Sequence, residues 1–311
     1  MTTQSTPWRT MHVLVIALLS SLLPLTAFSQ SKNKPLSSKT RIVLLGTGTP
    51  GWDPDRSGPA TAIVVNGTPY LIDFGPGVVR RAGAAYRKGV EGLYPPNIRV
   101  AFLTHRHVDH TVGYADLIFS PAQSRDVGRK QPLEVYGPKG LKDMTEHILK
   151  AHLLNPNDER YKVNAHEIKP GIIYKDENVT VKAFLVIHGD VEAFGYRFET
   201  PDRTVVISGD TGPAQSIIDN CNGCDVLIHE AYSMATHKDA SPADQANRKR
   251  LHTSSQELAE IAGKAKPGLL ILYHRSNIGG KGGSNPEGIL LKEIRKVYKG
   301  KVVTGHDLDI F

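Results

Sequence analysis

Cysteine is scarce in this chain of 311 residues, which contains only Cys221 and Cys224, in the stretch Cys-Asn-Gly-Cys. One such pair is too small a set for a zinc site built from thiolates. In an oxidising compartment the two thiols can form a small disulfide loop, whereas elsewhere they can remain buried thiols at the end of a helix. Both alternatives stay open, and neither cysteine is expected to take part in catalysis.

Long apolar stretches are also lacking, apart from one run over residues 13–28. This run is too short to span a membrane comfortably, and Pro24 interrupts it. Two small residues, Ala27 and Ser29, stand at the spacing that signal peptidase requires. We therefore predict a signal peptide over residues 1–29 and a periplasmic or extracellular mature protein with no membrane partner. An uncleaved N-terminal anchor is the alternative.

Charge of neither sign dominates the sequence, since 38 Lys and Arg stand against 31 Asp and Glu, a formal net charge of +7. This modest positive excess favours an anionic substrate. The basic residues do not gather into a long patch, so nucleic acid is not expected as a partner. The expected partner is a small anionic ester as substrate. Whether the chain forms a homodimer stays open.

Short β-rich runs alternate with helical segments along most of the chain. Residues 30–40 are polar and predict a flexible leader, whereas no linker interrupts residues 41–311, which we expect to form one domain. Meandering strands with helices between them predict an α/β fold with four layers, αββα, in which helices sandwich two mixed sheets. Strands are expected over 41–45, 60–65, 70–74, 98–104, 133–136, 179–187, 194–199, 204–208, 226–229, 269–273 and 302–303, and helices over 78–88, 139–153, 255–265 and 286–297. The third of these helices starts with a capping box, Ser254-x-x-Glu257.

A histidine-rich loop, Thr104-His-Arg-His-Val-Asp-His110, directly follows one of the predicted buried strands. Imidazole nitrogens and carboxylate oxygens are ligands that zinc and similar ions prefer. His105 and His107 can face one ion from an extended turn. Asp109 and His110 can face a second ion about 3.5–4 Å from the first, the usual separation in two-metal sites. The loop therefore predicts a metal site.

Three further polar residues stand at the ends of predicted strands: His188, Asp210 and His274. A single histidine in such a place usually belongs to the core or the rim. Three polar residues placed alike, all downstream of a histidine-rich loop, favour one shared site.

With the motif His-x-His-x-Asp-His complete, the sequence resembles the metallo-β-lactamase superfamily from about residue 41 to the C-terminus. The resemblance implies a four-layer αββα fold and a centre of two Zn²⁺ ions, for which Mn²⁺ or iron are alternatives. It implies that Asp73, in Leu-Ile-Asp-Phe-Gly, supports the metal loop from behind. It further implies two sets of ligands and a bridge between them: His105, His107 and His188 on one ion, Asp109, His110 and His274 on the other, and Asp210 on both.

A second resemblance concerns His229-Glu230-Ala231 and Leu251-His252-Thr-Ser-Ser255, which are similar to motifs of ribonuclease Z and the metallo-arylsulfatases. It implies that His252 donates a proton to the leaving oxygen and that Glu230 orients it. We expect the dipole of the following helix to lower the pKa of His252 and Glu230 to bring it back toward a useful range. Tyr232 and Tyr273 depart from this pattern, because both stand where the family has threonine.

The segment between Phe194 and Arg203 runs directly into the next predicted strand, where common ribonucleases Z carry a long arm that grips transfer RNA. We therefore expect a secreted binuclear zinc hydrolase that cleaves small anionic esters, either sulfate esters or phosphodiesters, by a metal-bound hydroxide. His252, Glu230 and Asp109 are the predicted catalytic residues. The alternatives are a ribonuclease Z-like endonuclease, an acyl hydrolase of the lactonase or β-lactamase type, and a metal-binding protein without catalysis.

Overall fold

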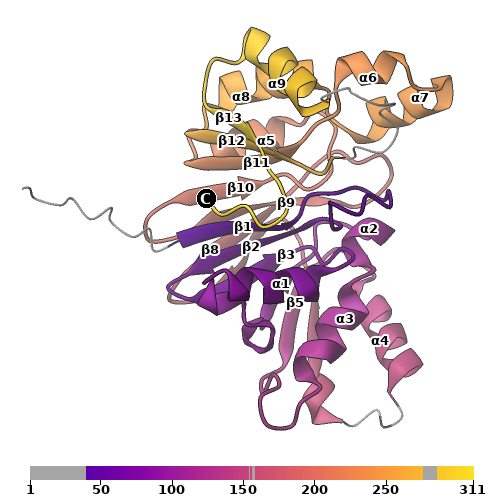
Figure 1. Cartoon of the computed structure of the whole chain (residues 1–311), viewed down its shortest axis with the longest axis vertical. Coiled ribbons are helices and arrows are strands. Elements are labelled where there is room, and N and C mark those ends of the chain that lie inside the picture. Colours follow the sequence, from indigo (N-terminus) through magenta and orange to yellow (C-terminus); the bar gives the residue numbers. More distant parts are fainter. Residues whose placement is uncertain (1–39, 154, 156–157, 276–285) are drawn as a thin grey trace, which may run out of the picture. The chain divides into compact units, whose positions relative to one another are not determined.

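A computed structural model describes residues 40–153, 155, 158–275 and 286–311 (Figure 1). These residues belong to one compact unit, Ser38–Phe311. The predicted signal peptide and all of the predicted leader except Thr40 lie outside the described residues. Within the described part of the chain, no helix has both the length and the apolar character needed to cross a membrane.

The first half of the unit forms a six-stranded sheet whose strands follow one another in chain order. The pairs β1–β2 and β2–β3 are antiparallel, and every later pair is parallel. The strands of this sheet are β1 (Thr40–Gly46), β2 (Ala60–Val65), β3 (Thr68–Ile72), β4 (Val100–Phe102), β5 (Leu133–Gly137) and β6 (Val163–Glu167).

The second half forms a seven-stranded sheet, again in chain order. Its strands β7 to β10 pair antiparallel, and β10 to β13 pair parallel. The strands are β7 (Gly171–Lys175), β8 (Thr180–Leu185), β9 (Phe194–Glu199), β10 (Thr204–Ile207), β11 (Val226–Glu230), β12 (Leu269–Tyr273) and β13 (Val302–Thr304). Thr200 and Arg203 close the β9–β10 hairpin through a backbone hydrogen bond of 3.1 Å, so a tight turn leads directly from one strand into the next, as the sequence predicts.

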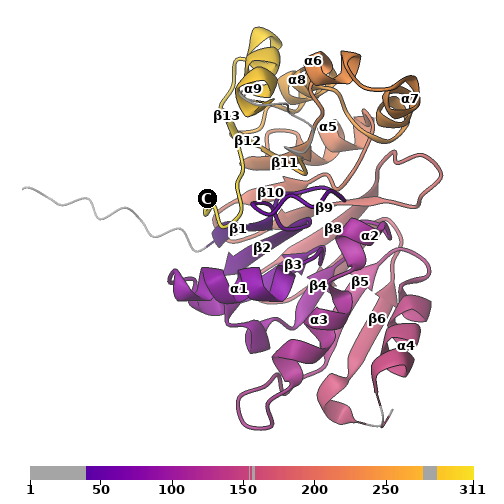
Figure 2. The ribbon, with the colours of Figure 1, turned by 45° about the vertical axis from the view of Figure 1, so that its right-hand side comes forward.

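Helices cover the outer face of each sheet, and Figure 2 shows both outer layers. On the first sheet they are α1 (Val78–Arg87), α2 (Val108–Thr111), α3 (Tyr114–Phe119) and α4 (Leu141–His152). On the second they are α5 (Gln215–Cys221), α6 (Met234–Lys238), α7 (Pro242–Leu251), α8 (Ser255–Ala265) and α9 (Pro286–Val297). Short 3₁₀ turns occur at Glu91–Leu93, Pro95–Asn97, Ser120–Ala122 and Glu159–Tyr161.

Alternating side chains of the strands divide the apolar interior into three layers. Tyr70 and Ile72 of β3 point into the core between the sheets, whereas Leu71 packs in the core beneath α1 and α3. On β11, Ile228 faces the core between the sheets and Leu227 packs against α5, α8 and α9. Because successive side chains of a strand point to opposite faces, each sheet is apolar on both sides. The predicted four-layer αββα fold is thus confirmed.

Element bounds predicted from the sequence hold best where the chain is well buried. Helix α8 has the predicted bounds, and the side chain of Ser254 and the backbone at Glu257 form the predicted capping box. The predicted strand over 98–104 is shortened to β4, because the Thr104 N–H turns away to bond the Asp73 carboxylate. Strands β6 and β7 were not predicted, since their side chains are largely half-buried or exposed and give little apolar pattern.

A disulfide bond and a pairing of the C-terminal segment with β1 complete the unit. Cys221, at the end of α5, forms a disulfide with Cys224, which settles the alternative left open by the sequence. The last residues of the chain lie along the free edge of β1. There Ile42 and Phe311 exchange two backbone hydrogen bonds of 2.9 Å, and the Leu44 N–H donates to the Asp309 carbonyl at 3.0 Å. This C-terminal segment covers an edge that would otherwise expose unpaired backbone groups.

Candidate metal centre

The predicted metal ligands lie in loops at the carboxyl ends of strands from both sheets. The histidine-rich loop follows β4 of the first sheet. His188, Asp210 and His274 follow β8, β10 and β12 of the second sheet, which all run in the same direction. The centre therefore lies between the two sheets, and each sheet supplies part of it.

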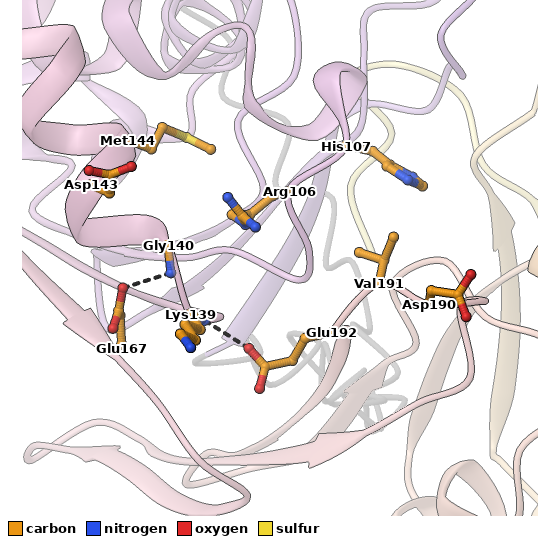
Figure 3. Close-up of a pocket in the computed structure, with 10 residues that line it drawn as sticks. All are labelled: Arg106, His107, Lys139, Gly140, Asp143, Met144, Glu167, Asp190, Val191 and Glu192. Carbon is orange, nitrogen blue, oxygen red and sulfur yellow. Dashed lines mark hydrogen bonds between the residues drawn. The ribbon is translucent and has the colours of Figure 1, made fainter.

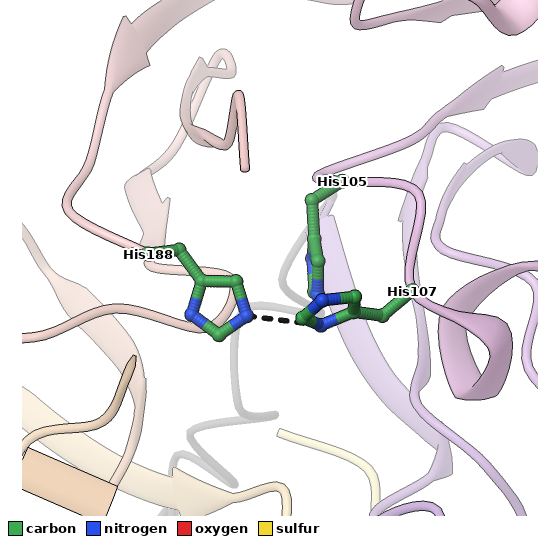
Figure 4. A group of neighbouring side chains, drawn as sticks. All are labelled: His105, His107 and His188. Atoms are coloured by element: carbon green, nitrogen blue, oxygen red, sulfur yellow. Dashed lines mark hydrogen bonds between the residues drawn. The ribbon is translucent and has the colours of Figure 1, made fainter. Parts of the chain in front are cut away.

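The first group of side chains consists of His105, His107 and His188, one nitrogen from each lying within 4.8 Å of the others (Figure 4). His188 Nε2 lies 3.0 Å from His107 Nδ1. Two ring nitrogens at this distance present their lone pairs or protons to the same space. The three rings thus form one set that could hold a metal ion.

The second group consists of Asp109, His110, Asp210 and His274, all buried, with ligand atoms within 4.8 Å of one another. His274 Nε2 lies 3.1 Å from Asp109 Oδ2 and 3.3 Å from Asp210 Oδ2. Asp210 Oδ2 also lies 4.0 Å from His105 Nε2, in the first group. Asp210 therefore stands between the two groups, in the place expected of a bridging carboxylate.

Asp73 holds the histidine-rich loop from behind. Its Oδ1 accepts the Thr104 N–H at 2.8 Å, and its Oδ2 lies 2.8 Å from His110 Nδ1. Asp73 is buried and has a φ of 58°, which non-glycine residues seldom adopt. His188 Nδ1 is similarly 2.8 Å from the Leu251 carbonyl oxygen. Such contacts on one ring nitrogen fix the ring and leave the other nitrogen facing the centre.

Several atoms that face the centre are buried without a partner. Within the described part of the chain, His105 Nε2, His110 Nε2 and Asp210 Oδ1 have no well-formed hydrogen bond, although His110 Nε2 lies 3.4 Å from Asp210 Oδ1. Buried polar atoms nearly always have partners, so a cluster of unpaired ones points to a missing ligand. A set of imidazole nitrogens and carboxylate oxygens suits zinc, and it also suits manganese and iron. The donor set therefore fits bound metal ions.

The electrostatics of the cluster also favour cations. Burial raises the pKa of the Asp210 carboxyl, yet the rings of His274 and His110 hold it well below its usual range. Burial lowers the pKa of His110, but the Asp210 and Asp73 carboxylates raise it well above its usual range. The Asp210 carboxyl is thus ionised, and its negative charge favours positive charge beside it at the centre.

His252 and Glu230 form a pair at the side of the centre. His252 Nδ1 lies 2.8 Å from Glu230 Oε1, and the same oxygen accepts the Thr211 N–H at 3.1 Å. The His252 ring lies 5.5 Å from that of His188 and 5.9 Å from that of His274. The structure therefore brings together all the residues that the sequence singled out for metal binding and catalysis.

The pKa of His252 lies above its usual value, whereas we expected Glu230 only to offset a decrease. The residue does stand two positions before Ser254, the N-cap of α8, as expected. Burial lowers the pKa of His252, but the Glu230 carboxylate, with smaller contributions from Asp210 and Asp109, outweighs burial and raises that pKa to about 9. Glu230 is 2% exposed, so its charge is poorly screened by water.

Tyr232 and Tyr273, which stand where the family has threonine, have different surroundings. The Tyr273 side chain is fully buried in the core between the sheets. The Tyr232 ring packs on His237 with centroids 5.0 Å apart, and its backbone bonds Thr253 and Ser255. This backbone pairing ties the segment after β11 to the segment that carries His252.

Sequence reasoning missed the residues that support the centre through single contacts. Thr104 lies 3.0 Å from His105 Nδ1 through its hydroxyl, and Thr253 donates its hydroxyl to the Thr211 carbonyl. A threonine gives no pattern that distinguishes such a role.

A pocket of about 960 Å³ opens beside the first group of histidines (Figure 3). His107 forms part of its wall, together with Asp190 and Val191 from the loop after β8. The opposite wall comes from the start of α4 and from Glu167 at the end of β6. The pocket and the metal centre therefore share one side chain, His107.

Comparisons with known proteins agree with this geometry. A family model described as β-lactamase superfamily domain matches residues 68–275. A ribonuclease Z of Mycobacterium bovis is 28% identical over 284 residues, covering 86% of this chain and 96% of the relative. The metallo-β-lactamase fold protein YhfI of Bacillus subtilis has a TM-score of 0.69 at 18% identity, covering 88% of this chain and 98% of that one. The short form of human tRNase Z has a TM-score of 0.66 at 24% identity, covering 87% and 98%.

Proposed function

Because this chain belongs to the β-lactamase superfamily, we propose that it is a hydrolase that cleaves phosphodiester bonds with two bound metal ions. One observation carries the proposal: Asp210 stands between two complete ligand groups, and His252 is held beside them by Glu230. The family and its hydrolytic chemistry support ester hydrolysis in general. Relatives named ribonuclease Z support a phosphodiester as the particular ester.

The two ligand groups would hold the metal ions, with zinc as our proposal for their identity. His105, His107 and His188 would hold one ion, and Asp109, His110 and His274 the other, with Asp210 shared. When bound, the ions would supply Lewis acidity at the scissile phosphate and activate water for attack. Asp109 is in this view a metal ligand beside His274, its Oδ2 3.1 Å from His274 Nε2, rather than a proton carrier.

The leaving oxygen would receive its proton from His252. Glu230 raises the pKa of the His252 imidazole to about 9, which favours the protonated ring at neutral pH. A protonated ring at the edge of the centre is placed to act as a general acid, and Glu230 keeps it in one orientation. Glu230 is itself fixed by the Thr211 N–H, so the pair does not depend on solvent for its geometry.

RNA is the first candidate substrate, because relatives that match most of this chain are named ribonuclease Z. The expectation that nucleic acid is not a partner therefore has no support. The comparisons also give no support to the sulfate ester, and they favour the ribonuclease Z-like alternative. Small phosphodiesters remain a second candidate. Common ribonucleases Z carry an RNA-gripping arm between the two strands that correspond to β9 and β10, and here the tight turn of residues 200–203 joins these strands.

Secretion remains part of the proposal. The apolar run over residues 13–28 and the small residues after it favour a signal peptide. The disulfide between Cys221 and Cys224 supports the same location, because disulfides persist in oxidising compartments. Detection of the protein in a periplasmic or extracellular fraction, with a mature N-terminus at Gln30, tests this point.

The test of function measures hydrolysis by the zinc-loaded protein of four substrates: a precursor transfer RNA, an unstructured RNA, bis-p-nitrophenyl phosphate and p-nitrophenyl sulfate. We expect cleavage of the phosphodiesters, and loss of it in His107→Ala. Cleavage of RNA identifies the nuclease, and cleavage of only the small diester identifies the second candidate. If protein with two zinc ions per chain cleaves only the sulfate ester or none of the four, the proposal is wrong.

A further inference from the structure

His252 stands in a short segment between two helices. It is the C-cap residue of α7, and Ser254, two residues later, is the N-cap of α8. Helix α7 is largely exposed, and within it only Leu251 is buried. A helix with so few contacts to the core is a poor frame for a side chain that has to be held accurately. The position of His252 therefore depends on the residues on either side of it.

Both neighbours of His252 in the chain are tied to loops that carry metal ligands. On one side, the Leu251 carbonyl oxygen accepts the His188 Nδ1–H at 2.8 Å. On the other side, the Thr253 hydroxyl donates to the Thr211 carbonyl oxygen at 2.7 Å. Thr253 and Thr211 are both fully buried, so water does not compete for this second bond. His252 is thus held against the metal-binding loops rather than by its own helix.

Thr211 is the residue at which several of these segments meet. It directly follows Asp210, the shared carboxylate of the two ligand groups. Its N–H donates to Glu230 Oε1 at 3.1 Å, its hydroxyl accepts the Ile187 N–H at 3.1 Å, and its carbonyl oxygen accepts the Thr253 hydroxyl. The Thr253 hydroxyl therefore connects the segment of the acid to the backbone of the loop that carries the shared ligand.

Of the contacts that hold this segment, the one made by Thr253 can be removed without changing a ligand or the acid pair. The Leu251 contact is made by His188, a predicted ligand, and Glu230 contacts the His252 ring itself. The Thr253 hydroxyl is in neither set. Its removal leaves a buried carbonyl oxygen without this donor, which favours a shift of the backbone on both sides of the lost bond.

We propose that Thr253 is a positioning residue for His252, because its hydroxyl fixes the acid relative to the loop that carries Asp210. The proposal rests on the proposed function, in which His252 gives its proton to the oxygen that leaves as the P–O bond breaks. Without the hydroxyl the imidazole shifts and proton transfer slows. The loss of rate then depends on how much the leaving oxygen needs a proton.

The test uses two esters that differ only in one leaving group, thymidine 5′-(p-nitrophenyl) phosphate and thymidine 5′-methyl phosphate. p-Nitrophenolate leaves as a stable anion, whereas either P–O ester bond of the methyl compound releases an alkoxide that must be protonated. The ratio of kcat/KM for the p-nitrophenyl ester to that for the methyl ester is measured with zinc-loaded protein. Thr253→Val should raise this ratio about tenfold, part of what a general acid contributes, and Thr253→Ser should keep the native ratio.

The matched control is Thr145→Val in α4, on the other sheet. Thr145 is also buried, and its hydroxyl also donates to a backbone carbonyl oxygen, that of Leu141, at 2.8 Å. The control removes the same kind of bond at a position that does not contact the segment of His252, and it should keep the native ratio. A native ratio in Thr253→Val, or an equal rise in Thr145→Val, overturns the proposal. Thr253→Ala takes the place of Thr253→Val if that variant does not fold.

Crystal structures of the zinc-loaded native protein and of the Thr253 variant separate this proposal from the proposed function. The rings of His252 and His188 lie 5.5 Å apart, and we expect the His252 ring to be displaced in the variant. If the native protein cleaves neither ester but the ring is displaced in the variant, the positioning role stands and the proposed function fails. A ring that keeps its native place overturns the role of Thr253, whether or not the esters are cleaved.

Discussion

The charge of Glu230 raises the pKa of His252, so the pH profile of activity can test whether His252 donates the proton. The acid must be protonated to act, so activity should fall as the pH rises through the pKa of His252, about 9. Glu230→Gln removes the negative charge that raises this pKa. We expect the alkaline limb of the pH profile of kcat to move to lower pH.

The matched control for this experiment is Glu260→Gln, at an exposed position of α8. It changes the same charge without touching His252 and should leave the limb where it is. A limb that stays in place in Glu230→Gln would mean that another group donates the proton.

Asp73 provides a second test at the residue scale, because it contacts the centre only through its hold on His110 and Thr104. Asp73→Ala should lower metal affinity by about 10- to 100-fold, as is typical for residues behind a metal ligand. Competition with a chromogenic chelator measures this affinity directly. Unchanged affinity in a folded Asp73→Ala variant would show that the loop holds its shape without the carboxylate.

At this scale the sequence predicted the residues that carry unusual chemistry and missed those that carry ordinary chemistry. Side chains such as His105, His107, Asp109 and His110 rarely stand so close together in a sequence unless they bind a metal ion. Thr104 and the Leu251 carbonyl group do as much to orient the rings, but a threonine and a backbone carbonyl group occur everywhere. The pKa of His252 was also beyond the sequence, because it depends on how deeply Glu230 is buried.

Among the elements, α8 positions His252, because the helix begins directly after the segment that carries it. Ser254 caps the helix and follows His252 by two residues. Ser254→Ala should lower the free energy of unfolding by about 1 kcal/mol, because it leaves N–H groups of the first turn without an acceptor. Urea denaturation measures this loss.

Ser241→Ala gives the matched comparison, since Ser241 caps the exposed helix α7 in the same way. Its cost should be smaller, because α7 buries only Leu251 and contributes less to the folded state. Equal costs for the two variants would contradict the view that the first turn of α8 is more tightly coupled to the core.

Element prediction succeeded for α8, α9 and the buried strands β2, β9 and β12, where the predicted and observed bounds agree. These segments have strong apolar periodicity, and α8 also has a cap that can be read locally. Helices α5 to α7 were not predicted. Helix α7 is almost entirely polar, so its sequence lacks the apolar face by which a helix is recognised.

For the molecule as a whole, the metal centre joins the two sheets, since ligands come from loops of both. Bound ions should therefore stabilise the entire unit. Zinc at 100 times its dissociation constant adds about 2.7 kcal/mol to the free energy of unfolding, so Tm should rise by roughly 5 °C over chelated protein. Scanning calorimetry tests this, and His107→Ala should show a smaller rise. No rise in the native protein would mean that zinc does not bind the folded centre.

The arrangement of layers was predictable because meandering strands and intervening helices leave few ways to bury apolar faces on both sides of two sheets. The strand order within each sheet and the C-terminal segment along β1 were not. They depend on contacts between residues far apart in the chain, such as Ile42 and Phe311, which no local pattern records.

That last pairing has a consequence for how the protein is made. Strand β1 is the first strand of the two sheets to be synthesised, and the residues that cover its edge come after all the other strands. Throughout translation, therefore, β1 keeps a row of unpaired backbone groups that can pair with any other extended chain. Removal of residues 308–311 would leave that edge open for good, so we expect a variant without them to aggregate even though it keeps every residue of the metal centre.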